Sequence, residues 1–318
     1  MSNIFRQHTL TSIKRIKEAS EHNKLVIFVG AGVSMNSGLP SWSDVVASMA
    51  EDLGILNKED NKEYCFSNDD YLKIPQYYFN ERKENEYCSK VISLFNKDCF
   101  PNPIHKLIFS LNPSHIITTN YDDLLEKTLK QSNIHKYCKV ACDEDLAIAP
   151  NANYIIKMHG ELKNCHNSFV LKESDYDSYS SNFTLLETFV KGVIATNTLL
   201  FIGFSASDGN VRRIFQWIHD IVGEKNRPAY LIDINSVLSE GEVVKYNYLK
   251  RQGIVKLFYN QIPEDKLKNY ENDLDKPLPE DGLKLYKFLK FISDYSEEVD
   301  SISVWYEKLK ILNDFAVT

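Results

Sequence analysis

Several segments of this sequence place glycine or polar residues directly after an apolar run, and they hold the side chains best suited to chemistry. They are GAGVS (30–34), TTNYD (118–122), HGE (159–161), GFSASDGN (203–210) and the end of LIDIN (231–235). If the apolar runs are parallel strands of an open α/β sheet, their carboxyl ends share one edge, which is where such sheets bind ligands. These segments therefore form the candidate site.

The glycines of the first segment would let another group approach the backbone closely. Gly30 and Gly32 follow the run LVIFV, and a helix beginning near Ser34 would add N–H donors and a dipole that favours a pyrophosphate. The spacing matches neither G-x-G-x-x-G nor G-x-x-x-x-G-K-[ST], since the next glycine is Gly38. A tight strand-to-helix turn with packing glycines explains the same residues. Both interpretations stay open.

Two side chains, Asn120 and His159, could take part in a reaction. Asn120 could cap the following helix, but Asp122 suits that position better and leaves Asn120 free. His159 ends the run YIIKMHG, and imidazole is the side chain that can act as a base near pH 7. A single histidine is more often a structural residue, so a structural role for His159 remains the alternative.

The order of apolar runs and amphipathic segments predicts the fold. Strands are expected at 25–29, 114–122, 154–160, 198–205 and 228–235, and helices at 5–22, 42–53, 105–111, 122–131, 185–196 and 212–222. Helices that alternate with buried, β-branched strands predict an α/β protein with a Rossmann-like, doubly wound parallel sheet.

Two segments fall outside this alternation. A polar, tyrosine-rich stretch at about 55–100 predicts an inserted helical module, and the tail predicts two amphipathic helices at 283–295 and 301–312. We therefore expect a catalytic domain at 1–260. The C-terminal helical segment at 261–318 would pack on that domain or form an oligomer or partner interface.

The composition is that of a globular protein. Of 318 residues, 43% are hydrophobic and 25% charged, with a formal net charge of −7 and no basic stripe. No apolar stretch reaches the ~18 residues of a membrane helix, and the N-terminus lacks the apolar core of a signal peptide. We expect a cytoplasmic protein with no direct contact to nucleic acid or membrane.

The six cysteines are scattered along the chain, so we expect them to be reduced and packed. Cys138 and Cys142 have three residues between them, which is a weak zinc signal because no second pair follows. We expect no metal.

The combination of GAGVSMNSGLPSW, TTNYD, KMHGE and FIGFSASDGN, in this order, resembles the sirtuin-like NAD-binding domain over about residues 20–240. Within that superfamily the chain is most similar to bacterial defence-associated sirtuins, whose sirtuin-like domain degrades NAD during phage infection. Protein-deacylating sirtuins carry a zinc ribbon with two C-x-x-C pairs, whereas this sequence has no C-x-x-C. The resemblance therefore implies NAD itself as the substrate and puts deacylation in doubt.

The resemblance also implies roles for individual residues. Asn120, supported by Asp122, would hold the nicotinamide ribose and position water, and His159 would act as general base. The other implied NAD contacts are Gly30, Ala31, Gly32, Ser34, Thr119, Gly203, Ser205, Asp208, Asn210 and, at the adenosine ribose, Asp233 or Asn235.

The implied activity is that of an NAD glycohydrolase that forms nicotinamide and ADP-ribose and depletes NAD in abortive infection. Nicotinamide is a cationic leaving group, so oriented water and a base of near-neutral pKa suffice. The alternatives are a regulatory module that senses NAD or ADP-ribose, and a protein deacylase or ADP-ribosyltransferase. We also expect a homo-oligomer, for instance a tetramer, and a phage protein, sensor domain or partner protein as the trigger.

Overall fold

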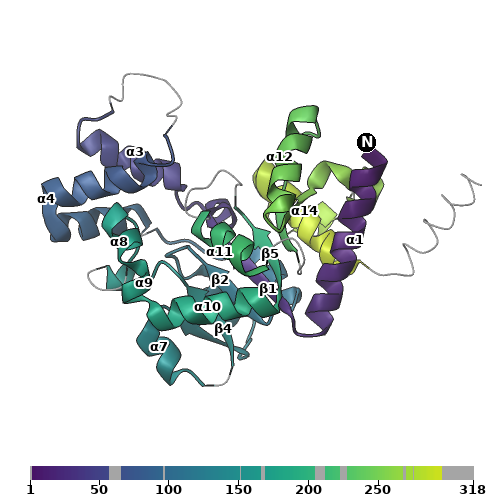
Figure 1. Cartoon of the computed structure of the whole chain (residues 1–318), viewed down its shortest axis with the longest axis horizontal. Coiled ribbons are helices and arrows are strands. Elements are labelled where there is room, and N and C mark those ends of the chain that lie inside the picture. Colours follow the sequence, from purple (N-terminus) through teal and green to yellow (C-terminus); the bar gives the residue numbers. More distant parts are fainter. Residues whose placement is uncertain are drawn as a thin grey trace, which may run out of the picture.

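Seven strands form one parallel sheet in the computed structural model (Figure 1), in the order β3-β4-β2-β1-β5-β6-β7. The structure describes residues 2–56, 66–95, 97–150, 152–165, 169–204, 212–222, 228–267, 270–274 and 276–295. The strands are β1 (Leu25–Val29), β2 (His115–Thr118), β3 (Tyr137–Val140), β4 (Asn153–Lys157), β5 (Thr198–Ile202), β6 (Ala229–Asp233) and β7 (Ile254–Phe258). The chain extends the sheet from β1 first to one side and then to the other, so the predicted doubly wound fold is confirmed.

The sequence predicts five of these strands and misses β3 and β7. β3 lies at an edge of the sheet, and its central residues Cys138 and Lys139 are only half-buried, so it shows no apolar run. β7 contains Lys256, which is 6% exposed and forms ion pairs of 2.5 Å with Asp233 and 3.1 Å with Glu242. Tertiary partners make the burial of this charge possible, and sequence periodicity does not reveal them.

Helices cover both faces of the sheet and form two apolar layers. Alternate side chains of β1 supply the two layers, so Ile27 packs on one face and Phe28 on the other. The helices of the first layer are α1 (Ser2–Glu21), α5 (Pro103–Ser110), α6 (Leu124–Gln131) and α14 (Glu280–Asp294), and those of the second are α10 (Thr184–Thr196), α11 (Arg212–Val222) and α12 (Glu240–Arg251).

α14 belongs to the core of the first layer. Its residues Phe288, Leu289 and Ile292 are fully buried, and Figure 1 shows the helix beside α1. This helix contains the first predicted tail helix. The second, at 301–312, lies outside the described residues, and the division of the chain at residue 260 stays a prediction.

A helical module stands beside the sheet and is formed by α3 (Trp42–Asp52) and α4 (Asp70–Phe95), which pack together (Figure 1). α3 begins where the sequence predicts, because Ser41 and Asp44 form a capping box in which Ser41 Oγ accepts from the Asp44 N–H at 3.1 Å. α4 is broken at Lys83, whose φ of 62° is left-handed.

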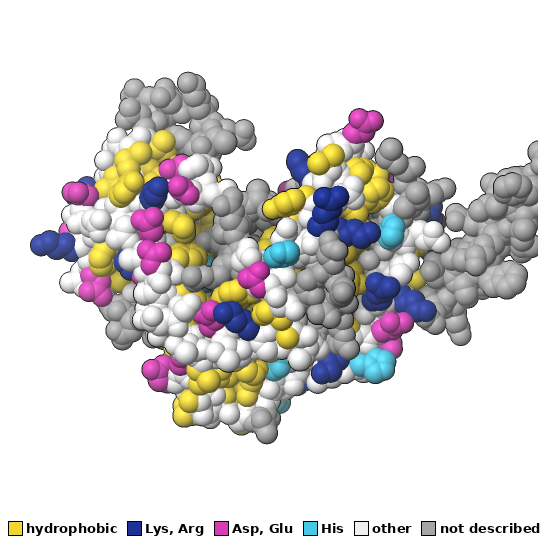
Figure 2. Space-filling model, viewed as in Figure 1, with side chains coloured by type: hydrophobic (Ala, Val, Ile, Leu, Met, Phe, Trp, Pro, Cys, Tyr) yellow, Lys and Arg dark blue, Asp and Glu magenta, His cyan; other side chains and the backbone are white. Residues whose placement is uncertain are grey.

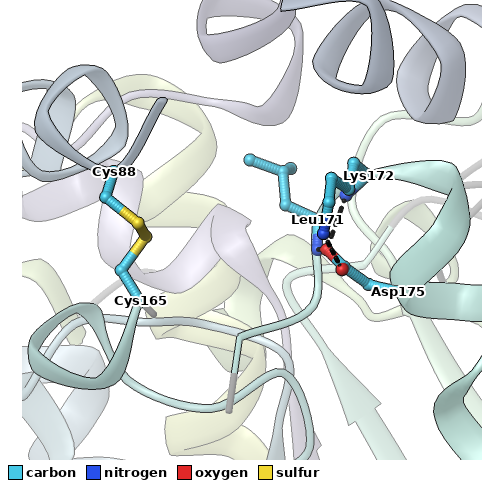
Figure 3. Close-up of a disulfide and its surroundings, with 5 residues drawn as sticks. All are labelled: Cys88, Cys165, Leu171, Lys172 and Asp175. Atoms are coloured by element: carbon cyan, nitrogen blue, oxygen red, sulfur yellow. Dashed lines mark hydrogen bonds and ion pairs between the residues drawn. A yellow bond between two sulfur atoms is a disulfide. The ribbon is translucent and has the colours of Figure 1, made fainter. Parts of the chain in front are cut away.

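A disulfide between Cys88 of α4 and Cys165 joins this module to the segment after β4 (Figure 3). The expectation that all cysteines are reduced is therefore wrong. The two residues are 77 positions apart in sequence but their Cα atoms lie 5.8 Å apart, a proximity that only the packing of the module creates. Cys99, Cys138 and Cys142 are free thiols. Within the described part of the chain, no group of three or more His, Cys, Asp or Glu side chains is placed to hold a metal.

Charged side chains of both signs are interspersed over the face of the molecule in Figure 2. No helix among the described residues is long and apolar enough to cross a bilayer.

Candidate active site

The carboxyl ends of four neighbouring strands bring the predicted site segments together. β4, β2, β1 and β5 are consecutive in the sheet, so HGE, TTNYD, GAGVS and the start of GFSASDGN follow each other along one edge. This edge includes the place beside β1 where the strand order reverses, which is the usual ligand position in doubly wound sheets.

The glycines at this edge serve the contact between two loops. The N–H of Gly30 donates to the Ile202 carbonyl at 2.9 Å, and that of Gly32 to the Gly203 carbonyl at 3.0 Å. A Cβ at Gly30 would lie 2.6 Å from the Gly203 carbonyl oxygen. Gly203 has a φ of +73°, and a Cβ there would lie 2.8 Å from the Val33 nitrogen. Packing therefore accounts for these glycines, and a pyrophosphate would meet the loop surface rather than these two N–H groups.

The side chain of Asn120 is held from the end of β1. Its Nδ2 donates to the Gly30 carbonyl and to Ser34 Oγ, both at 3.1 Å, and its backbone N–H donates to Thr118 Oγ1 at 3.0 Å. Asn120 is 8% exposed, and its Oδ1 is buried with no hydrogen-bond partner among the described residues. Buried acceptors are nearly always bonded, so this oxygen is placed to accept from a bound ligand.

Thr119 and Asp122 flank Asn120 in different ways. Thr119 Oγ1 is a second buried polar atom without a partner in the part of the chain that the structure describes. Asp122 Oδ1 accepts from the Leu124 N–H at 3.1 Å at the start of α6, but the N-cap residue of this helix is Asp123 rather than the expected Asp122. Ser34, rather than Asp122, holds the Asn120 amide.

His159 lies two positions after the end of β4 and is 4% exposed. Its carbonyl accepts from the Val170 N–H at 3.1 Å. Its ring centroid lies 5.5 Å from that of Tyr176, 6.3 Å from Trp42 and 6.4 Å from Tyr121. These aromatic contacts fix the position of the imidazole.

Two cavities meet at Ala31 and Trp42, which line both. The larger has a volume of about 900 Å³ and includes Gly32, Gly203 and Asn235 in its lining. The smaller includes Ser34, Asn120 and Asp122. The larger volume is within the range of ~300–1,000 Å³ typical of small-molecule sites. His159 lines neither cavity, but its ring neighbour Trp42 lines both.

The remaining predicted contacts lie elsewhere. Asp233 ion-pairs with Lys256 and accepts from the Ser236 N–H at 2.9 Å, and it lines neither of these cavities. Asn235, the alternative at the adenosine ribose, lines the large one. Ser205, Asp208 and Asn210 fall outside the described residues.

Two residues of this site have no predicted role. Trp42 is expected only as the start of a helix, yet it lines both cavities and contacts His159. Lys157 is 1% exposed and precedes His159 by two positions. A signal for Lys157 was available, since a charge inside the predicted buried strand YIIKMHG requires acceptors from elsewhere in the fold.

His105, a buried residue of α5, makes the free energy of unfolding depend on pH. It occupies the third position of α5, where its Nδ1 accepts from the Asn102 N–H at 3.2 Å. Burial lowers its pKa from 6.5 to about 4, against the opposing effect of Asp122. The imidazole of His105 therefore binds a proton more tightly in the unfolded chain than in the folded one. Neutral His105 makes its full contribution to the free energy of unfolding above pH 6.5, and this contribution is lost as the pH falls toward 4.

We expect His105→Gln to remove this pH dependence, because Gln at the third helical position preserves a capping box and does not titrate. The free energy of unfolding of the wild type should fall by about 2 kcal/mol more than that of His105→Gln between pH 7.5 and pH 5. Urea unfolding at the two pH values measures the difference. Parallel pH profiles of the two proteins would contradict the prediction.

Fold and site together define a Rossmann-like α/β protein with a cavity of dinucleotide size at the carboxyl ends of its strands. Residues 114–255 match the family model of the SIR2-like domain. This region of the chain is therefore similar to the SIR2-like domain, in agreement with the resemblance that the motifs predict.

Curated relatives match about three quarters or more of the chain. Defense-associated sirtuin 2 of Bacillus subtilis is 34% identical over 236 residues, which cover 74% of this chain and 23% of the relative. Proteins named NAD(+) hydrolase ThsA are 30% identical over 244 residues in Enterococcus faecium and 29% over 259 residues in Acinetobacter baumannii. These matches cover 76% and 80% of this chain, and 49% and 52% of the relatives. The chain thus spans about half or less of the length of these relatives.

Proposed function

We propose that this chain hydrolyses NAD to nicotinamide and ADP-ribose as part of a defence against phage. The names of the relatives support this proposal, since they include NAD(+) hydrolases and a defence-associated sirtuin. The observation that carries it is the buried Asn120 Oδ1, which has no partner among the described residues. Asn120 lines a small cavity of about 20 Å³, which meets the cavity of dinucleotide size at Ala31 and Trp42.

The two cavities suggest how NAD would lie. The nicotinamide ribose would occupy the end at Ala31 and Trp42, which adjoins Asn120. The diphosphate would cross the surface of Gly32 and Gly203, and the adenosine would reach Asn235. Of the two residues left open for the adenosine ribose, the cavity favours Asn235 over Asp233.

In the proposed mechanism, Asn120 Oδ1 accepts a hydrogen bond from a hydroxyl of the nicotinamide ribose. The glycosidic bond breaks and its electron pair moves to the ring nitrogen, which becomes neutral. Water adds to the ribose carbon and gives up a proton to His159, which releases it to solvent. Because the Trp42 indole contacts this imidazole and also lines both cavities, its rotation would open a path from His159 to the bound ribose.

The direct test is the amount of nicotinamide and ADP-ribose formed from NAD by the purified chain over a range of protein concentrations. We expect the two products in equal amounts. NAD that stays intact at every concentration, both alone and with candidate phage proteins added, although calorimetry shows that it binds, would contradict hydrolysis by this chain.

That contrary result would favour a module that senses NAD or ADP-ribose. The burial of His159 outside both cavities is the observation that fits such a module. In that case NAD would bind wild type and His159→Asn with equal affinity, and neither protein would form product.

The adenosine end of the large cavity predicts a preference for NAD over NADP. Glu280 and Asp281 line this end, and Asn235 Nδ2 donates to Asp281 Oδ2 at 3.1 Å. Among the described residues no lysine or arginine lines the cavity. A 2′-phosphate would meet these carboxylates without a cationic partner, so we expect kcat/KM for NADP to be roughly tenfold below that for NAD.

The double variant Glu280→Gln/Asp281→Asn should bring kcat/KM for NADP closer to kcat/KM for NAD. Nicotinamide release from each dinucleotide measures the two values. Glu271→Gln is the control, because Glu271 belongs to the same C-terminal segment but lines no part of the cavity. Equal kcat/KM values for NAD and NADP in the wild type would refute the prediction.

We also propose that the chain acts as a homo-oligomer and that a phage protein, a sensor domain or a partner protein triggers it. Light scattering across concentrations tests the first proposal, and NAD consumption with candidate phage proteins added tests the second.

A further inference from the structure

Lys157 links the two strands that carry the proposed catalytic residues. It is the last residue of β4, two positions before His159, and pairs in the sheet with Thr118, two positions before Asn120. Its side chain is 2% exposed. A buried ammonium group requires a hydrogen-bond acceptor for each of its N–H donors.

Three acceptors surround this ammonium group, and two of them belong to the segment after Asn120. The Lys157 Nζ donates to the Tyr121 carbonyl at 3.2 Å and, through a short contact, to the Asp122 carbonyl. It also donates to Glu126 Oε1 at 3.3 Å, which supplies a countercharge from α6. The three donors of the ammonium group are thereby satisfied.

Asn120 is held by two sets of contacts, one to its side chain and one to the backbone that follows it. Gly30 and Ser34 fix its amide nitrogen from the end of β1, while Lys157 holds the two carbonyls that directly follow it. The Oδ1 atom is therefore positioned by contacts before and after it in the chain.

We propose that Lys157 is a positioning residue of the NAD-hydrolysing site, which sets the conformation of the Asn120 loop relative to His159. This inference rests on the proposed function. The ammonium group acts through the backbone and does not touch the substrate, since Lys157 lines neither cavity that meets at Ala31 and Trp42. Its loss should therefore change kcat more than the binding of NAD.

The test compares Lys157→Met with Lys139→Met in the full chain. Both lysines line a third cavity of about 710 Å³. Lys139 lies on the edge strand β3 and pairs with Glu161, which keeps Lys163 as a second partner at 3.0 Å. Among the described residues Lys139 pairs with Glu161 and not with the Asn120 loop, so its variant controls for loss of a lysine from this cavity.

We expect Lys157→Met to lower kcat for nicotinamide release on the order of 10²-fold, as small misplacements of reacting groups do. The dissociation constant of NAD, measured by calorimetry, should stay within about twofold of the wild-type value. Lys139→Met should leave both quantities unchanged.

A second readout does not require activity. In ¹⁵N-asparagine-labelled protein, the side-chain amide signals of Asn120, assigned by their loss in Asn120→Ala, should shift in Lys157→Met and stay in place in Lys139→Met. If the wild type does not hydrolyse NAD even with candidate phage proteins added, the proposed function fails and this measurement alone decides the positioning role. If Lys157→Met does not fold, Lys157→Gln is used, because it removes the charge and keeps a polar group. Unshifted Asn120 signals in the folded variant, or a kcat within twofold of wild type, would overturn the inference.

Discussion

His159→Asn is expected to lower kcat for nicotinamide release by about 10²- to 10⁴-fold, the usual contribution of a general base. Asn keeps a polar side chain among the aromatic rings of Trp42, Tyr121 and Tyr176 but cannot take up the proton of the attacking water. The affinity for NAD should remain close to the wild-type value, because His159 lines neither cavity. Product formation and calorimetry measure the two effects.

His22→Asn is the control for this experiment, since His22 is an exposed residue at the start of the sheet-forming part of the chain, after α1. It should leave kcat unchanged. If His159→Asn retains wild-type kcat, His159 has the structural role that a single histidine most often has, and the base must be sought elsewhere.

Asn120→Asp is expected to lower kcat on the order of 10²-fold and to destabilise the fold by about 1–3 kcal/mol. The change preserves shape but replaces the Nδ2 donor by an oxygen that faces the Gly30 carbonyl, 3.1 Å from Nδ2 in the wild type. Two buried acceptors then face each other. Protonation of the introduced carboxyl would restore one donor, so the loss of stability should be smaller at pH 5 than at pH 8.

Asn197→Asp is a matched control. Asn197 is also buried, and its Nδ2 likewise donates to one carbonyl, Val193 at 2.9 Å, and one hydroxyl, Thr196 at 3.0 Å. It precedes β5, at the edge of the sheet opposite the site. This variant should lose stability and keep kcat, as urea unfolding and nicotinamide release would show. Equal losses of kcat in both variants would mean that Asn120 acts only through stability.

Local patterns predicted much of the architecture. The apolar run LVIFV is β1, with every residue buried, and Ser41 caps α3 as its type suggests. Such features depend on neighbouring residues, because burial periodicity and capping act within a few positions of the chain. Local patterns do not predict β7, because the buried charge of Lys256 interrupts its apolar run. That charge is compensated by Asp233 and Glu242, which belong to other elements.

The order of apolar runs in the sequence predicts which segments end the strands, and therefore that Asn120, His159 and the glycines share one edge of a parallel sheet. The contacts that these residues make there come from the tertiary structure. Gly30 and Gly203 are glycines because the two loops touch each other. Ser34 holds Asn120 across 86 positions of sequence, and Lys157 joins the loops of β2 and β4. Contacts of this kind depend on which strands become neighbours, and strand order arises from the packing of the whole chain rather than from any local pattern.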